Sequence, residues 1–204
     1  MGKVYTIVNQ KGGVGKTTTC INLGAYLGQF GQRTLLIDLD PQANATSCLG
    51  IDRTKVEHGT YEVLIGSVAA RESILHNPRF KISLIPSSAN LAGAEIEMIE
   101  FSERERRVRR IVEELRDRYD YVLIDCPPSL GLLTLNGLMA ALDGVIIPVQ
   151  CEYGALEGLG QLTQTLTRIR QNLFPELDIR GVLLTMFDGR TNLSTDVMRE
   201  VQKF

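Results

Sequence analysis

The sequence has no excess of charge of either sign. Its 22 Lys and Arg residues nearly balance 24 Asp and Glu residues, for a formal net charge of −2. Global charge therefore gives no argument for nucleic-acid binding, and any contact with DNA must come from a local basic patch. The 204 residues, 44% of them hydrophobic, suffice for one substantial core, so we predict a single domain over residues 1–204.

Cysteine is scarce, and its spacing carries no motif. Cys20, Cys48, Cys126 and Cys151 lie far apart without a C-x-x-C pair. A disulfide framework is therefore not expected, and the four are interpreted mostly as small buried residues. The same spacing disfavours a redox carrier that holds an iron–sulfur cluster between two subunits through paired cysteines, which is one alternative function.

The sequence also lacks a long unbroken apolar run. The longest apolar stretch, residues 130–149, contains Asn136, Asp143 and Pro148. It falls short of the roughly 20 apolar residues that a membrane span requires. Residues 1–4 enter a strand-like run without the apolar core of a signal peptide. We therefore expect a cytoplasmic protein with no transmembrane segment.

The strongest chemical signal is a glycine-rich segment between an apolar run at 4–8 and a helical pattern. Glycines let backbone N–H groups point at phosphate oxygens, and the start of the following helix adds its positive end. Lys16 can reach the outer phosphates of a nucleoside triphosphate, and Thr17 can ligate Mg²⁺. A glycine-rich turn without a ligand would need no lysine. The predicted nucleotide-binding residues are Lys11, Gly12, Gly13, Val14, Gly15, Lys16, Thr17 and Thr18.

Acidic residues follow two predicted strands. Asp38 and Asp40 come directly after the apolar run 33–37. One carboxylate near Mg²⁺ and a second aimed at the attacking water would serve triphosphate hydrolysis, although Asp38 could instead cap the turn. Asp125 ends the run 121–124, where burying it unpaired would be expensive, and this favours a role in holding Mg²⁺. The predicted metal ligands are Thr17, Asp38 and Asp125.

Strand-like and helical segments alternate along the chain. This alternation predicts an α/β fold: a doubly wound, mostly parallel sheet with helices on both faces and a ligand at the carboxyl ends of the strands. Strands are predicted at 4–8, 33–37, 82–85, 121–124, 144–149 and 181–186, and helices at 17–30, 103–119, 155–173 and from about 194.

Two of the predicted helices leave a functional question open. Helix 103–119 carries five arginines, but glutamates interleave with them, so a solvated face is favoured over a nucleic-acid patch. Helix 155–173 repeats apolar residues along one side. That side could pack on the sheet or contribute to a contact between subunits.

The phosphate-loop motif departs from its common form. Gln10 stands where the first glycine is usual, and Lys11 adds a second lysine. In this and in other segments the chain resembles the ParA/MinD family of deviant Walker ATPases, which have a P-loop NTPase-like fold. The resemblance extends over nearly the whole chain and rests on residues 11–18, 38–47, 125–134, 148–153 and 183–186.

The resemblance implies an ATP- and Mg²⁺-dependent ATPase of chromosome or plasmid segregation, associated with the nucleoid. ATP would close a sandwich homodimer that binds DNA without sequence preference, and a ParB-type partner would stimulate hydrolysis. By position in the motifs, Lys11 crosses to the nucleotide of the partner subunit and joins Lys16 in catalysis. Asp40 supports hydrolysis. Arg190 contacts DNA from a polar loop without a structural partner, unless it is an ordinary exposed arginine.

The main alternative is a MinD-like membrane-associated positioning ATPase, which would carry a C-terminal amphipathic helix. The sequence ends at Phe204, inside a helix predicted to begin near Ser194. Family members continue with a further strand, an adenine-contacting loop and a terminal helix. The resemblance therefore implies that the adenine-contacting residues lie beyond Phe204.

Overall fold

A sheet of seven strands, in the order β3-β4-β2-β5-β1-β6-β7, forms the centre of the molecule. The computed structural model describes residues 1–203, and Phe204 lies outside them. Neighbouring strands pair in parallel except β3, which is antiparallel to β4. The predicted, mostly parallel sheet is confirmed. The strands are β1 (Lys3–Ile7), β2 (Thr34–Asp38), β3 (Leu75–Asn77), β4 (Ile82–Ile85), β5 (Tyr121–Asp125), β6 (Val145–Gln150) and β7 (Ile179–Thr185).

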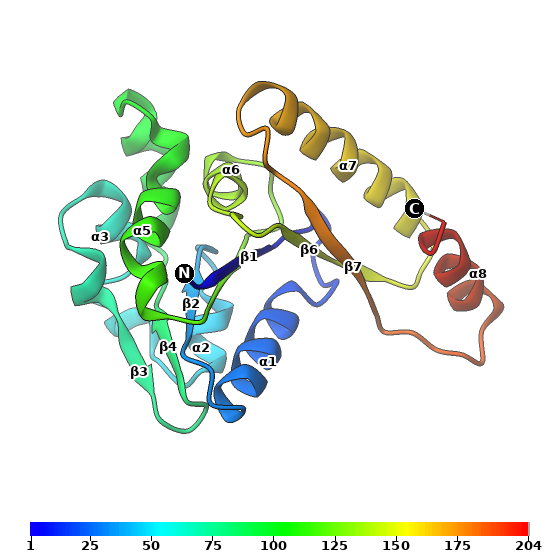
Figure 1. Cartoon of the computed structure of the whole chain (residues 1–204), viewed down its shortest axis with the longest axis horizontal. Helices are drawn as coiled ribbons and strands as arrows, with labels where there is room; N and C mark the ends of the chain where they lie inside the picture. The colour runs from blue at the N-terminus through cyan, green and yellow to red at the C-terminus, as the bar shows by residue number, and fades with distance from the viewer. Residues whose placement is uncertain (204) are drawn as a thin grey trace.

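Helices cover both faces of this sheet, as the alternation predicted (Figure 1). α1 and α2 pack on one face, whereas α4, α5, α6 and α7 pack on the other. The helices are α1 (Lys16–Gln29), α2 (Asn44–Cys48), α3 (Thr60–Ile65), α4 (Leu91–Glu97), α5 (Arg107–Leu115), α6 (Leu132–Met139), α7 (Ala155–Asn172) and α8 (Asn192–Val201).

Strand β2 shows why the central strands are continuously apolar. Leu35 and Ile37 belong to the large cluster under α4 to α7, and Leu36 belongs to the smaller cluster under α1 and α2. All three side chains are fully buried. A parallel strand covered by helices on both faces needs apolar residues at odd and even positions alike. The strand therefore places its last residue, Asp38, at a fixed position where the carboxyl ends of the strands lie.

The structure differs from the prediction in the region of α5. The regular helix spans Arg107–Leu115, with short 3₁₀ turns before and after it, so it is shorter than the predicted 103–119. Glu103 has a left-handed backbone (φ 52°), which an α-helix cannot contain. Of the residues predicted for the apolar side of the helix, Val108, Ile111, Val112 and Leu115 are buried, whereas Tyr119 follows the second 3₁₀ turn and is half-buried.

Further corrections concern elements and cysteines. The apolar stretch 130–149 contains the unpredicted helix α6 before strand β6, and the short edge strand β3 was also missed. Among the described residues, no helix has the length and apolar character to cross a membrane. Cys20, Cys126 and Cys151 are buried as predicted, but Cys48 is exposed.

Candidate active site

The glycine-rich loop lies at the carboxyl end of β1, the strand between β5 and β6 in the sheet. Gly13 and Gly15 have positive φ angles of 76° and 91°. Side-chain-bearing residues rarely adopt this conformation, so both positions require glycine. Gly15 directly precedes α1, which begins at Lys16, so the loop brings its backbone N–H groups to the start of a 14-residue helix. This is the geometry of an anion site.

Two side chains outside the motif fix the loop to the neighbouring strands. Asn9 Nδ2 donates to the carbonyl of Pro148 in β6 at 2.7 Å, and Asn9 Oδ1 accepts from Lys11 N at 3.0 Å. The Thr185 hydroxyl, at the end of β7, donates to the carbonyl of Val14 at 2.8 Å. The sequence motifs predict neither contact. For the Asn9 contact, the available signal is a polar residue directly after an apolar strand.

Lys16 is buried at the first position of α1 and is 7% exposed. Its Nζ donates to the carbonyl of Lys11 at 2.9 Å, so the side chain folds back along the loop. Burial lowers the pKa of Lys16, and the negative charges of Asp125 and Asp40 oppose that shift. Lys16 thus lies within electrostatic reach of both predicted acidic residues.

Asp125 lies at the end of β5, in register with Asp38 at the end of β2. It is fully buried, and neither carboxylate oxygen accepts a hydrogen bond from any residue in 1–203. Burial raises its pKa, as do the charges of Asp38 and Asp40. The Thr17 hydroxyl beside this carboxylate lowers its pKa and so opposes the effect of burial. A buried carboxylate without donors favours a cationic ligand in this place.

Asp38 is equally buried but has its oxygens occupied. Oδ2 accepts from Thr46 N at 2.8 Å and from the Thr46 hydroxyl at 2.6 Å, while Oδ1 accepts from Asp40 N at 3.2 Å. Burial raises the pKa of Asp38, and the Thr46 contacts work against that shift. Asp38 therefore holds the turn that follows β2, as its capping interpretation expects, while its role as a metal ligand stays a prediction.

Asp40 lies at the same edge, 6% exposed. Its Oδ1 accepts from Gln42 N at 2.9 Å, which is the contact of a tight turn. Its charge acts on the pKa values of Lys16 and Asp125. The structure therefore brings Asp40 together with the loop lysine and with Asp125.

Two further predicted cations have acidic partners within the chain. Lys11 Nζ forms an ion pair with Glu152, in the loop after β6. The Arg190 guanidinium pairs with Asp188 through two nitrogens, with Arg190 Nη2 at 2.7 Å from Asp188 Oδ2. The prediction that Arg190 has no structural partner is therefore wrong, although its side chain is exposed. Because Asp188 sits beside it, the pKa of Arg190 is raised and its net charge is offset locally.

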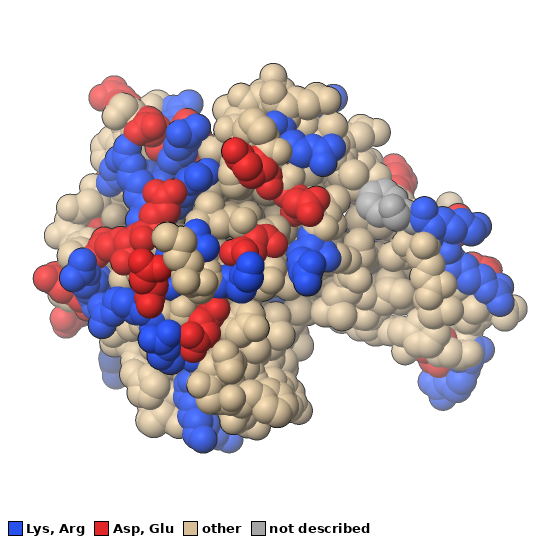
Figure 2. Space-filling model, in the orientation of Figure 1, with Lys and Arg blue, Asp and Glu red and all other residues tan. Residues whose placement is uncertain are grey.

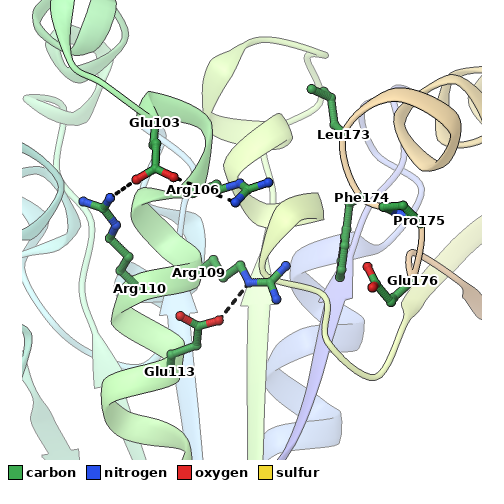
Figure 3. A pocket seen from close by; sticks show the side chains of 9 residues that line it. All are labelled: Glu103, Arg106, Arg109, Arg110, Glu113, Leu173, Phe174, Pro175 and Glu176. Carbon is green, nitrogen blue, oxygen red and sulfur yellow. Dashed lines mark hydrogen bonds and ion pairs between the residues drawn. The ribbon is translucent and has the colours of Figure 1, made fainter.

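The arginines near α5 form a separate groove of about 440 Å³ with the segment after α7 (Figure 3). Arg110 and Arg106 pair with Glu103, and Arg109 pairs with Glu113 at 2.8 Å. Arg109 also lies over the Phe174 ring, 4.9 Å from its centroid. Positive and negative side chains intermingle over this face (Figure 2). The observed pairing agrees with the predicted solvated face.

Comparison with known proteins gives the family. Residues 2–179 match the family model described as AAA domain. The chain is 52% identical over 204 residues to the sporulation initiation inhibitor protein Soj of Bacillus subtilis, covering 100% of this chain and 80% of that protein. It is 49% identical over 205 residues to the chromosome partitioning protein ParA of Myxococcus xanthus, covering 100% of this chain and 72% of that one.

A solved structure adds evidence on the fold. The cobyrinic acid a,c-diamide synthase of Mycobacterium smegmatis, crystallised with an ATP analog and magnesium, superimposes with a TM-score of 0.94 at 42% identity. The match covers 100% of this chain and 82% of that one. The chain therefore belongs to the AAA domain family, as a P-loop ATPase of the ParA/MinD type. The family prediction from the sequence is confirmed.

Proposed function

We propose that the chain is an ATP-dependent DNA-segregation ATPase. The observation that carries the enzymatic part is the buried Asp125 without donors, next to Thr17 and to a glycine loop at the start of α1. The partition role is supported by the names of relatives that are about half identical over the whole chain. The protein would act in the cytoplasm, on the nucleoid.

The residues present fit ATP with Mg²⁺. Loop residues 11–18 hold the phosphates through backbone N–H groups, and Lys16 neutralises the outer phosphate oxygens once its contact to the Lys11 carbonyl opens. Thr17 and Asp125 are the proposed residues on the Mg²⁺ side, because the orphaned carboxylate gains a cation there. Bound Mg²⁺ would supply charge neutralisation for the departing phosphate. Asp38 contributes through the turn it holds.

Asp40 is proposed to orient the attacking water. Its carboxylate is nearly buried, and within the described residues no hydrogen bond engages its Oδ2. An oxygen of this kind can accept a hydrogen bond from a water and hold it for attack. Asp40→Ala should therefore keep ATP binding and lose turnover.

A sandwich homodimer is proposed on the face that carries the loop. Exposed apolar side chains follow the ends of β5, β6 and β7 on this side of the sheet. Exposed apolar groups gathered at one edge are typical of contact surfaces. Lys11 can serve a partner's nucleotide only if its pair with Glu152 opens, so Lys11→Ala should bind ATP but stay monomeric. The side chains are Leu130, Tyr153, Met186 and Phe187.

The dimer is proposed to bind DNA without sequence preference, with Arg190 as one phosphate contact. A ParB-type protein would stimulate hydrolysis and release. Arg190 must exchange Asp188 for a DNA phosphate in this scheme. Its contribution to affinity is therefore expected to be small.

The function is tested by retention of unrelated DNA duplexes with ATP, with ADP and without nucleotide. Retention with ATP alone, lost in Lys11→Ala, is the expected result. Lys55→Ala, at an exposed lysine that pairs with Asp52 and is not one of the loop residues 11–18, serves as the control. DNA retention that is the same with ATP, with ADP and without nucleotide would contradict the proposal. Nucleotide-dependent sedimentation with anionic lipid vesicles, without DNA retention, would favour the MinD-like alternative.

A further inference from the structure

Four residues at the carboxyl ends of β2 and β4 form a closed ring of hydrogen bonds. Asp38 Oδ2 accepts from the Thr46 hydroxyl at 2.6 Å, and that hydroxyl oxygen accepts from Ser87 N at 2.8 Å. The Ser87 hydroxyl then donates to the Asp40 carbonyl at 2.8 Å. Asp40 N donates to Asp38 Oδ1 at 3.2 Å and closes the ring.

The ring joins segments that are distant in the sequence. Asp38 ends β2, Thr46 lies in α2, and Ser87 follows β4. Asp38, Thr46 and Ser87 are fully buried, and Asp40 is 6% exposed. Buried polar groups that satisfy one another in this way resist rearrangement, because opening one bond leaves another group unpaired.

The ring holds the backbone of Asp40 on both sides. Its N–H donates to Asp38 Oδ1, and its carbonyl oxygen accepts both from the Ser87 hydroxyl and from Ala43 N, each at 2.8 Å. Among the ring's four residues, Asp40 is the one whose side-chain oxygen Oδ2 is left without a hydrogen bond in the described chain. The position of that oxygen therefore depends on these three backbone contacts and on the Gln42 contact to Oδ1.

We propose that Ser87 and Thr46 are positioning residues for ATP hydrolysis, acting by holding Asp40 in place. This inference rests on the proposed role of Asp40. The loop residues, Thr17 and Asp125 share no hydrogen bond with Ser87 or Thr46. Loss of the ring should therefore lower turnover while ATP affinity stays the same, since catalysis depends on placement more steeply than binding does.

Ser87→Ala removes one of the two donors to the Asp40 carbonyl and leaves Ala43 N as the other. We expect kcat to fall roughly tenfold, with KM and the Kd for ATP within about twofold of the parent, which is the size of one well-placed buried hydrogen bond. Ser88→Ala is the matched control, because Ser88 is adjacent and 6% exposed but its hydroxyl has no partner in residues 1–203. The control should keep the parent kcat.

A pair of variants at Thr46 separates the hydrogen bonds from packing. Thr46→Val keeps the volume and removes the hydroxyl, so it should lose turnover as Ser87→Ala does. Thr46→Ser keeps the hydroxyl and should therefore retain the turnover of the parent. Because one ring is broken in either case, Ser87→Ala combined with Thr46→Val should lose little more turnover than the more damaged single variant.

Several outcomes overturn the inference. Parent kcat in Ser87→Ala or in Thr46→Val, equal loss in Ser88→Ala, or losses that multiply in the double variant would each contradict it. Reduced ATP affinity in step with kcat would show a general structural role instead. Asp40→Ala is measured alongside. Parent turnover in Asp40→Ala would refute the proposed role of Asp40 itself. Lost turnover in Asp40→Ala together with parent turnover in Ser87→Ala would refute only the role of the ring.

Discussion

Asp38 and Asp125 occupy matching positions but differ in their surroundings. Each ends a buried parallel strand, and the two are register partners in β2 and β5. The Asp38 carboxylate accepts three hydrogen bonds from Thr46 and Asp40, whereas the Asp125 carboxylate accepts none in the described chain. Burial raises the pKa of both. Within the described chain the Asp38 carboxylate is engaged by hydrogen bonds and the Asp125 carboxylate is not, which supports the proposed role of Asp125 beside Mg²⁺.

The difference between the two positions lies in the connection after each strand. After β2, residues 39–43 lead into α2, and this connection brings the N–H and hydroxyl of Thr46 back to the Asp38 carboxylate. After β5 a connection of similar length, residues 126–131, precedes α6, but no donor from residues 1–203 returns to the Asp125 carboxylate. Strands of the same kind thus produce different sites through their connections.

The largest effect is expected at Lys16, the cation beside the donor-free carboxylate. Lys16→Ala should lower ATP affinity by about 100-fold or more, because a nearly buried charge-assisted contact to the phosphates is lost. Calorimetric titration measures this directly. Lys55→Ala, at an exposed lysine paired with Asp52, should bind ATP as the parent does. Unchanged affinity in Lys16→Ala would remove the basis for the site.

The two aspartates should respond oppositely when their side chains are removed. Asp38→Ala should lower the free energy of unfolding by about 2–4 kcal/mol, because buried donors on Thr46 and Asp40 are left unpaired. Asp125→Ala should leave the nucleotide-free protein equally stable or more stable, since it removes a buried group without donors. Urea denaturation of both variants measures these free energies, and equal destabilisation would contradict the difference between the two aspartates.

The pH dependence of stability should report on Asp125. Burial raises its pKa to about 8, so the folded protein keeps a proton that the unfolded chain releases near pH 4. Between these two pKa values, rising pH favours the unfolded state. Asp125 then lowers the free energy of unfolding by up to about 1 kcal/mol per pH unit. Urea midpoints of the nucleotide-free parent should fall from pH 5 to pH 8. The fall should be shallower in Asp125→Asn, and identical slopes would contradict the assignment.

The smallest effect is expected at Arg190. With Asp188 beside it, Arg190→Ala should weaken DNA binding only a few-fold and flatten the salt dependence by roughly one unit of slope at most. Asp188→Ala should strengthen binding, because it releases the guanidinium. Fluorescence anisotropy over a salt series compares the two. An unchanged slope in both would identify Arg190 as an ordinary exposed residue.

The parts of the fold set by local pattern were predictable from the sequence. Apolar runs gave six of the sheet's strands to within two residues, and the glycine loop with its lysines marked the phosphate site. β3 was missed because its three residues, Leu75–Asn77, are partly or fully exposed and carry no apolar pattern. α6 was missed because it is buried along most of its length, so its residues are apolar without helical periodicity.

Contacts between distant segments were not predictable. The sequence spacing does not indicate that the Ser87 hydroxyl donates to the Asp40 carbonyl or that Glu152 pairs with Lys11. Such contacts depend on the order of strands in the sheet, which places β4 beside β2 and β6 beside β1. The sequence therefore identified the acidic residues but not the division of roles among them.

The central claim is that Asp125, and not Asp38, is the carboxylate available to a metal–nucleotide complex. Titration of ATP with and without Mg²⁺ into the parent and into Asp125→Ala tests it most directly, with Thr46→Ser as a variant that keeps the turn intact. We predict that Mg²⁺ strengthens ATP binding in the parent and in Thr46→Ser but not in Asp125→Ala. An equal gain from Mg²⁺ in all three proteins would contradict the account.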